Sequence, residues 1–375
     1  MHSQQDMIGK PSLTALTHRL RINGRFLGRS VTGVDRFAGE WLRAVDRLRQ
    51  AGDPCAAPLD IRLLVPRGIE PPAGLATIPC DVVGRLHGHA WEQLELPVAA
   101  RDGWLVNLCN SGPLATRRQL VVIHDVATFR VGEAYSRAFR AWYGRMVPWL
   151  YRRAGRVATV SRFSRSEMAE LFGPRDDVIV LPEGVDHVRG ATADPSILDR
   201  HGLRQRPYVL AVSSQSPHKN FSAVVAAVQS IGDAPFDVVV AGGQNPKVFG
   251  GGAPLPDFVR YVGYVSDAEL VSLYRNAACF VFPSRYEGYG LPPVEAMACG
   301  CPVLAARAAS MPEVLGEAAI YFDPGDPAEL AARLTELMAD ASERERRKQL
   351  GLNHVEGLKW EVAARCLLNS FAPQP

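Results

Sequence analysis

Short apolar runs rich in valine, isoleucine and leucine recur along the chain and alternate with stretches of helical periodicity. In the first half these runs fall at 20–23, 61–66, 105–108, 120–123, 157–161 and 178–182, and in the second half at 208–213, 236–241, 259–262, 279–283, 302–305 and 319–322. Continuous apolar strands that alternate with helices are typical of parallel sheets covered on both faces. Two such series predict an α/β protein with two doubly wound domains.

A segment rich in glycine and proline, residues 183–207, separates the two series and is predicted to be a linker with a short helix. The length of 375 residues suits two domains better than one core. We therefore expect an N-terminal domain over residues 1–190 and a second domain over residues 191–359.

The composition, with 47% hydrophobic and 22% charged residues, is that of a soluble globular protein. No apolar run approaches the roughly 20 residues that span a bilayer, and the first residues lack the apolar core of a signal peptide. Seven scattered cysteines favour a reducing compartment over a disulfide scaffold. The close pair Cys299 and Cys301 has no histidine nearby, which favours small core residues over a metal site. The sequence thus predicts a cytoplasmic protein.

The net charge of +3 hides an asymmetry between the two halves. Residues 1–190 carry 26 Lys and Arg against 19 Asp and Glu, or +7, and the rest of the chain carries 16 against 20, or −4. A basic first half suits an anionic partner, such as a membrane surface or a lipid-linked phosphate. An arginine-rich composition that spreads charge without purpose is the alternative.

One predicted helix, at about 135–156, is strongly amphipathic. Its apolar stripe covers about 120° of the helix and its arginines occupy the other side; the stripe is Phe139, Trp142, Tyr143, Met146, Trp149 and Leu150, and the arginines are Arg137, Arg140, Arg145 and Arg152. Packing of the stripe into the N-terminal domain is the first interpretation. A helix that lies on a membrane surface, with basic flanks and an aromatic face, is the alternative.

The most informative motif, residues 284–303, follows directly after a predicted strand. Open α/β sheets bind ligands at the carboxyl ends of their strands. Gly288 and Gly290 allow the backbone to approach a ligand closely, as phosphate or sugar oxygens require. Glu287 in the loop and Glu295, about two helical turns further along, can hold two hydroxyl-bearing parts of one ligand.

This motif resembles the signature of the large family of retaining glycosyltransferases with the GT-B fold, numbered family 4, and similar segments recur along nearly the whole chain. The resemblance implies two Rossmann-like domains that face each other across a cleft, with a last helix, about 360–375, that crosses back to the first domain. In that family the first glutamate contacts the donor sugar and the second the nucleotide ribose, which assigns these roles to Glu287 and Glu295. The implied donor loop also contains Gly288, Tyr289, Gly290 and Leu291.

Segments of the first half match other parts of the family pattern. Gly33, in Thr-Gly-Val-Asp-Arg-Phe-Ala, matches the glycine loop whose backbone faces the donor phosphate. His124, in Val-Ile-His-Asp-Val at the end of a predicted strand, matches the active-site histidine beside the sugar. The residues expected on the acceptor side are Asp125, Gly112, Ser161 and Ser164, and for the two serines a role as helix caps is the alternative.

Lys219, in the segment Ser-Ser-Gln-Ser-Pro-His-Lys-Asn, matches the lysine of the family that binds the donor diphosphate. A compact cation suits the charge that develops on a departing phosphate. Ser213 is also expected on the donor side, at a position where many family members have an arginine. Because serine carries no charge, Arg285 and His218 are the candidates for a second cation that assists departure of the diphosphate.

Two further segments extend the resemblance through the second half. Residues 262–266, Val-Gly-Tyr-Val-Ser, resemble the loop at the edge of the nucleobase and imply donor contacts from Tyr264 and Val265. The segment Lys-Trp-Glu-Val-Ala-Ala from residue 359 resembles the start of the last helix, which makes Trp360 a packing anchor.

The resemblance implies a retaining hexosyltransferase that needs no cofactor and no metal. No carboxylate nucleophile is evident near His124, so front-face displacement is expected, with the leaving diphosphate helping to deprotonate the incoming hydroxyl. An Asp-x-Asp metal motif is absent. GDP-mannose is the first choice of donor. The expected acceptor is a glycan or a polyprenyl-diphosphate-linked saccharide of surface polysaccharide synthesis, met at the inner face of the cell membrane.

Other functions of Rossmann-like domains fit the sequence less well. The chain lacks Gly-x-Gly-x-x-Gly after its first predicted strand and lacks a P-loop lysine motif, which argues against a dehydrogenase and an NTPase. Nucleic acid is not an expected partner. A UDP-sugar-dependent transferase, a sugar-phosphate synthase and a non-catalytic nucleotide-sugar-binding scaffold remain as alternatives. A scaffold would be expected to have lost His124, Lys219 or Glu287, and all three are present.

Overall fold

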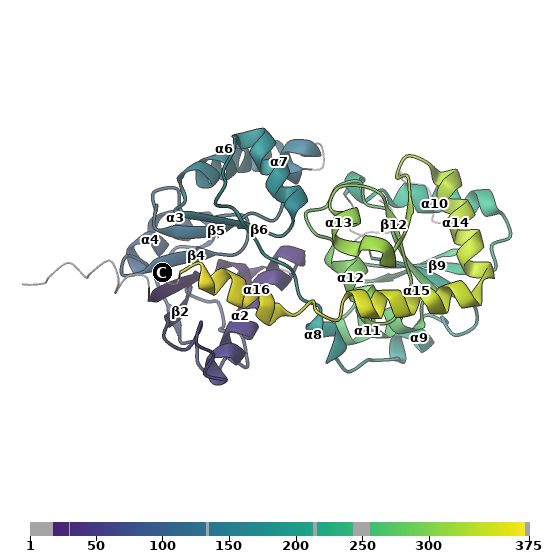
Figure 1. The fold of residues 1–375 in the computed structure, drawn as a ribbon, viewed down its shortest axis with the longest axis horizontal. Helices are drawn as coiled ribbons and strands as arrows, with labels where there is room; N and C mark the ends of the chain where they lie inside the picture. The colour runs from purple at the N-terminus through teal and green to yellow at the C-terminus, as the bar shows by residue number, and fades with distance from the viewer. Residues whose placement is uncertain (1–17, 30, 133–134, 213–215, 243–255, 372–375) are drawn as a thin grey trace, which may run out of the picture.

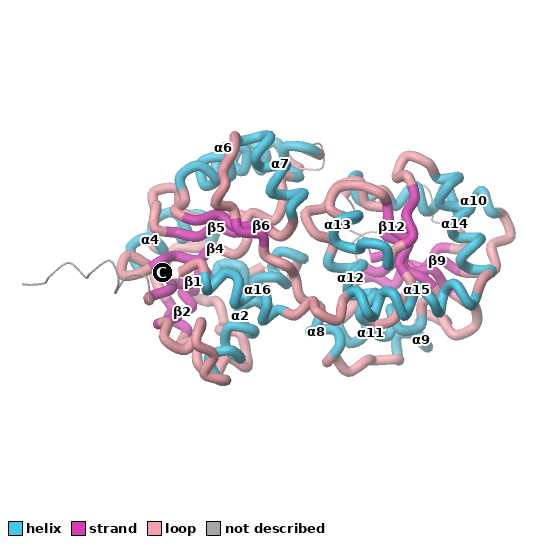
Figure 2. The backbone as a smooth tube through the Cα atoms, in the orientation of Figure 1, coloured by secondary structure: helices cyan, strands magenta, loops and turns pink. Residues whose placement is uncertain are grey.

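Two parallel β-sheets, each covered by helices, form two neighbouring units (Figure 1). The computed structural model describes residues 18–29, 31–132, 135–212, 216–242 and 256–371. The chain passes between the units twice, once after the first sheet and again just before its last helix (Figures 1 and 2).

The first sheet has seven parallel strands in the order β3-β2-β1-β4-β5-β6-β7. They are β1 (Arg19–Asn23), β2 (Asp60–Val65), β3 (Cys80–Val82), β4 (Trp104–Asn107), β5 (Gln119–Val122), β6 (Arg156–Thr159) and β7 (Ile179–Val180). The accompanying helices are α2 (Gly33–Gln50), α3 (Gly88–Leu94), α4 (Leu96–Ala99), α5 (Ala127–Arg130), α6 (Arg137–Arg153) and α7 (Arg162–Phe172). A central first strand from which the chain moves outward to both sides is the doubly wound Rossmann arrangement.

The second sheet repeats this order with six parallel strands, β10-β9-β8-β11-β12-β13. They are β8 (Tyr208–Val212), β9 (Asp237–Ala241), β10 (Val259–Gly263), β11 (Cys279–Phe282), β12 (Val303–Ala306) and β13 (Ile320–Phe322). Its helices are α10 (Phe221–Ile231), α11 (Asp267–Asn276), α12 (Leu291–Ala298), α13 (Met311–Leu315), α14 (Pro327–Ala339) and α15 (Ala341–His354). Two short helices, α8 (Asp186–Arg189) and α9 (Ser196–Arg200), lie in the segment between the sheets.

The strands coincide with the apolar runs of the sequence. All residues of β5 and of β9 are buried, because helices cover both faces of a parallel sheet. The prediction of two doubly wound domains with the GT-B arrangement is confirmed. The short strand β3 was not predicted, since its three residues are partly exposed and carry no apolar run.

The last helix, α16 (Trp360–Asn369), crosses back to the first unit and packs against α2, as the resemblance implied (Figure 1). Trp360 is fully buried and meets the edge of Phe37 with ring centroids 5.7 Å apart. A Cβ atom at Gly184 would lie 2.2 Å from the backbone nitrogen of Trp360. The two crossings of the chain therefore touch, and Gly184 permits their close approach.

Helix α6 is shorter at both ends than predicted. Met146 and Leu150 of its apolar stripe are buried, whereas Phe139 and Trp149 are 37% and 45% exposed. Packing into the domain therefore accounts for part of the stripe only, and contact with a membrane surface stays a prediction. Among the described residues, no helix is long and apolar enough to cross a membrane.

Candidate active site

His124 lies just beyond the carboxyl end of β5 and is almost completely buried. Its Nε2 atom lies 2.8 Å from the carbonyl oxygen of Leu108, and because a carbonyl only accepts, Nε2 carries a proton. Its Nδ1 atom faces the carboxylate of Glu183 at 3.8 Å. The ring meets the edge of Phe37 with centroids 4.8 Å apart. Both nitrogens thus face protein groups, and the ring fixes the loop that carries Asp125.

Glu183 was not among the predicted site residues, although it follows β7 at the same edge of the sheet. Its carboxyl is buried, and burial raises its pKa while the contact with His124 opposes that rise. Its backbone oxygen accepts a hydrogen bond from the hydroxyl of Tyr289 at 3.3 Å. Its position in the sequence could have identified it, because a carboxylate directly after a parallel strand lies where such sheets bind ligands.

The loop with Gly288 touches the first unit through two serine hydroxyls. Ser161 donates to the backbone oxygen of Gly288 at 2.6 Å and, as the N-cap of α7, accepts from the backbone of Ser164. The Ser164 hydroxyl lies 2.8 Å from the backbone oxygen of His124 and 3.3 Å from that of Gly288. A Cβ atom at Gly288 would lie 2.3 Å from the same His124 oxygen. The cap role of Ser161 is confirmed, whereas that of Ser164 is wrong, because Ser164 lies inside α7 and its hydroxyl bonds these two backbone oxygens. Acceptor contacts of the two serines stay predictions.

Lys219 and Glu287 come from different loops and form an ion pair, with Nζ 2.5 Å from Oε1. Lys219 ends a 3-10 turn after β8, and Glu287 follows β11. Ser310 donates its hydroxyl to the backbone oxygen of Glu287 at 3.0 Å. Two predicted catalytic residues thus meet at one point, with a part of each side chain open to solvent.

The two candidates for a second cation differ in their surroundings. His218 is half buried, its Nδ1 has no hydrogen-bond partner among the described residues, and burial together with the charge of Lys219 lowers its pKa. A histidine with a lowered pKa is neutral at physiological pH. Arg285 is exposed, and its guanidinium makes a long contact of 3.4 Å with the Pro324 oxygen. Arg285 keeps its positive charge at this pH, which favours it over His218 as the second cation.

Glu295 lies on α12, is buried, and is held by two residues that the sequence did not single out. Nε2 of His187 lies 2.9 Å from its Oε1 atom, and the Tyr274 hydroxyl donates to Oε2 at 3.2 Å. The indole N–H of Trp360 donates to Nδ1 of the same histidine at 3.0 Å. The predicted ribose carboxylate is therefore fixed from two sides.

A cavity of about 180 Å³ lies between the start of α2 and the start of α12. It includes five predicted donor residues: Gly33, Tyr264, Val265, Leu291 and Glu295. Apolar residues at the ends of β8 and β9, Val212 and Ala241, form part of its wall. Arg36 of α2 and Asp267 of α11 form a two-pronged ion pair beside it, at 2.6 and 2.5 Å, which links the two units. A partly apolar lining with a few polar groups is typical of small-molecule sites.

The remaining predicted residues differ in how the structure places them. A Cβ atom at Gly33 would meet no atom of the described ranges within 4 Å, so these ranges leave the space above this glycine open to a ligand. At Gly112 a Cβ atom would lie within 3.0 Å of the side chains of Asn107 and Gln119, which gives this glycine a packing role. Ser213 lies outside the described residues.

Two family models match the chain, one on each unit. "Glycosyltransferase Family 4" matches residues 57–189, and "Glycosyl transferases group 1" matches residues 195–354. Together they span most of the chain, which therefore belongs to the family-4 glycosyltransferases with the GT-B fold.

The chain is similar to curated members of this family. It is 29% identical over 277 residues to the O-antigen chain mannosyltransferase B of Escherichia coli, covering 69% of this chain and 71% of that protein. It is 24% identical over 278 residues to the serotype-specific mannosyltransferase WbdA of Escherichia coli, covering 68% of this chain but only 33% of WbdA. The chain thus spans about a third of the length of that relative.

Among solved structures, the chain resembles the sucrose-phosphate synthase of Thermosynechococcus elongatus. The TM-score is 0.69 at 18% identity, over 92% of this chain and 96% of that one. At this identity the likeness supports the GT-B fold alone.

Proposed function

We propose that this glycosyltransferase is a retaining, metal-independent hexosyltransferase that takes its sugar from GDP-mannose. The observation that carries the proposal is the ion pair of Lys219 and Glu287. Glu287 lies in the loop after β11, and the next residue of this loop, Gly288, contacts the backbone of His124. The cavity lined by Glu295 and Gly33 offers a place for the nucleotide. Two curated relatives are named mannosyltransferases, which favours mannose over other hexoses.

Lys219 and Glu287 divide the donor between them in this proposal. When the donor binds, Lys219 turns from Glu287 to the diphosphate, and Glu287 accepts hydrogen bonds from sugar hydroxyls. As the sugar–phosphate bond breaks, the ammonium group stabilises the charge that grows on the leaving oxygen. That oxygen takes the proton of the incoming hydroxyl, and the new bond forms on the face that the diphosphate leaves.

His124 and Glu295 have positioning roles in the proposed reaction. The ring of His124 faces Leu108 and Glu183, so it acts through the backbone that carries Asp125 toward the acceptor side. Glu295 accepts the ribose hydroxyls from its place beside the cavity. Positioning of both substrates converts a bimolecular reaction into one within a single complex.

Metal independence and the acceptor belong to the proposal as well. Within the described ranges, no group of three His, Cys, Asp or Glu side chains could hold a metal ion. The proposed acceptor is a glycan or a polyprenyl-diphosphate-linked saccharide in the synthesis of a surface polysaccharide, at the cytoplasmic face of the membrane. The basic first half suits such an anionic acceptor.

A thermal-shift series with GDP-mannose, UDP-glucose and free GDP and UDP tests the donor. A ligand at 100 times its Kd stabilises the folded state by about 2.7 kcal/mol. We expect GDP-mannose to give the largest shift, and a larger shift with UDP-glucose would reassign the donor.

A second assay tests the reaction itself by following slow hydrolysis of GDP-mannose in excess EDTA. Glu287→Gln serves as the matched inactive control. Turnover that EDTA abolishes and manganese restores would refute the metal-free mechanism. Hydrolysis at the same rate in Glu287→Gln would remove the proposed site.

A further inference from the structure

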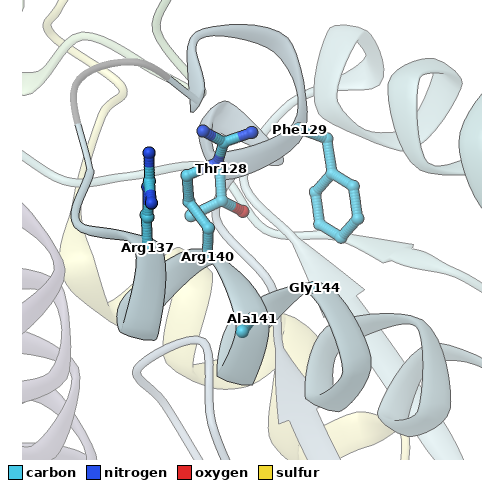
Figure 3. A pocket seen from close by; sticks show the side chains of 6 residues that line it. All are labelled: Thr128, Phe129, Arg137, Arg140, Ala141 and Gly144. Carbon is cyan, nitrogen blue, oxygen red and sulfur yellow. The ribbon is translucent and has the colours of Figure 1, made fainter.

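A second cavity, of about 510 Å³, lies on the first unit between α5 and α6 (Figure 3). Its residues come from these two helices and are Thr128, Phe129, Arg137, Arg140, Ala141 and Gly144. Figure 3 shows the side chains of Arg137 and Arg140 rising from the start of α6 toward the same side, next to Thr128. Among the described residues that line it, none has an acidic side chain.

The guanidinium groups of Arg137 and Arg140 have no ion-pair partner in the part of the chain that the structure describes. Other arginines nearby are engaged. Arg130 pairs with Glu167 at 2.7 Å, and Arg145 donates to the backbone oxygen of Ala141 at 3.0 Å. Two guanidinium groups on successive turns of a helix, neither paired with a described carboxylate, present planar forks of N–H donors, which match the oxygens of phosphate.

The cavity lies near the predicted reaction centre. Thr128 follows His124 by four residues, and four residues of extended chain span at most about 14 Å. On the other side, Tyr135 precedes Arg137 by two residues, and burial with the nearby carboxylates of Asp125 and Glu287 raises the pKa of Tyr135 to about 12. Residues 124–128 and 135–137 therefore connect the cavity with the place where the sugar would be transferred.

We propose that this cavity binds a phosphate or diphosphate group of the acceptor, with Arg137 and Arg140 as residues that determine acceptor specificity. The inference rests on the proposed transferase function, since it concerns the second substrate of that reaction. Phosphate is favoured over a single carboxylate because two guanidinium groups match the higher charge of a phosphate ester. The phosphate belongs either to a soluble sugar phosphate or to a lipid-linked diphosphate.

Calorimetric titration with pyrophosphate tests the site, using the full chain saturated with GDP so that the donor site is filled. We expect wild type to bind pyrophosphate, and the double variant Arg137→Gln/Arg140→Gln to bind it at least tenfold more weakly. Arg145→Gln is the matched control, because Arg145 is exposed on the same helix but lies outside the cavity. Equal affinity in wild type and the double variant would overturn the proposal, as would an equal loss in Arg145→Gln.

Two further titrations distinguish a soluble from a lipid-linked source of phosphate, and a nucleotide control distinguishes failure of the anion site from failure of the proposed function. Mannose 1-phosphate and vesicles of phosphatidylglycerol replace pyrophosphate in turn. Mannose 1-phosphate binding that depends on the two arginines indicates a soluble acceptor, and vesicle binding that depends on them indicates a lipid-linked one. Vesicle binding that Arg145→Gln weakens as much as the double variant means a general membrane surface, and refutes the cavity. If neither GDP nor UDP produces a thermal shift, the proposed function fails, while pyrophosphate titration without nucleotide still decides the anion site.

Discussion

The indole N–H of Trp360 donates a hydrogen bond to Nδ1 of His187, with the two nitrogens 3.0 Å apart. An indole can only donate, so this nitrogen of the imidazole must carry a lone pair. The proton of the neutral ring therefore lies on Nε2, which donates to Oε1 of Glu295 at 2.9 Å. The first residue of the crossing helix thus determines which histidine tautomer faces the predicted ribose carboxylate.

The first prediction concerns Trp360→Phe, which keeps an aromatic ring and removes the donor. Without that donor the proton of His187 can move to Nδ1, and Nε2 then turns a lone pair toward Glu295. We expect nucleotide affinity to fall about tenfold, or by about 1.4 kcal/mol. Fluorescence titration with free GDP or UDP measures the change.

Trp91→Phe is the matched control for this change. Trp91 is also fully buried, and its indole donates to the backbone oxygen of Val83 at 2.8 Å. Both variants should lose about 1–3 kcal/mol of unfolding free energy, because each leaves a partly buried partner without its hydrogen bond. Only Trp360→Phe should weaken nucleotide binding. Equal nucleotide affinities in the two variants would show that the hydrogen bonds from Trp360 through His187 to Glu295 have no role in binding.

Lys219→Ala is expected to lower turnover by about 10²–10³-fold, the range for loss of one preorganised electrostatic group. The change also leaves Glu287 without its ion-pair partner. Lys348→Ala, on the exposed side of α15 with a partner in Glu345, is the matched lysine control. Turnover of Lys219→Ala within a few-fold of that control would mean that another group stabilises the leaving diphosphate.

Gly288→Ala tests the contact between the two units. A methyl group there would lie 2.3 Å from the backbone oxygen of His124, so the loop must shift. Because a misplacement of about 1 Å can reduce a rate about 10²-fold, we expect a loss of that order in turnover with nucleotide affinity retained. Gly357→Ala, where a Cβ atom meets none of the residues that the structure describes within 4 Å, is the control. Full activity of Gly288→Ala would mean that this approach is not needed for transfer.

Part of the site could be predicted because it follows from the order of the strands. Lys219 and Glu287 are 68 residues apart in sequence. They meet because β8 and β11 are neighbours in the sheet, and the loops after parallel neighbours share one edge. A motif found after each strand is therefore enough to bring the two residues together.

The rest depends on how the two units are placed against each other. Glu183, His187 and the hydrogen bond of Trp360 all lie at the two crossings of the chain, where neither helical nor strand periodicity carries information. The contacts of Ser161 could also be predicted only in part. Its cap role follows from its place before α7, whereas its bond to Gly288 needs the relative position of the units.

The last prediction uses Glu183, whose carboxyl has a raised pKa because it is buried. The unfolded chain has the ordinary glutamate pKa of 4.5, so the folded state binds this proton more tightly than the unfolded state does. Its contribution to stability is therefore fully present below pH 4.5 and is lost as the pH rises through the folded pKa. His124, His187 and Glu295 also face this carboxyl and shape its titration.

Glu183→Gln removes this titration and keeps the size of the side chain. The difference in unfolding free energy, variant minus wild type, should grow as the pH rises above 4.5 and through the raised pKa of the folded state, because only the wild type has to bury a charge at the higher pH. Urea unfolding of both proteins across this range measures the difference, and Glu70→Gln, at an exposed position, should give a flat line. A flat line for Glu183→Gln, or one that falls with pH, would mean that the ion pair with His124 outweighs burial and that the carboxyl is charged at neutral pH.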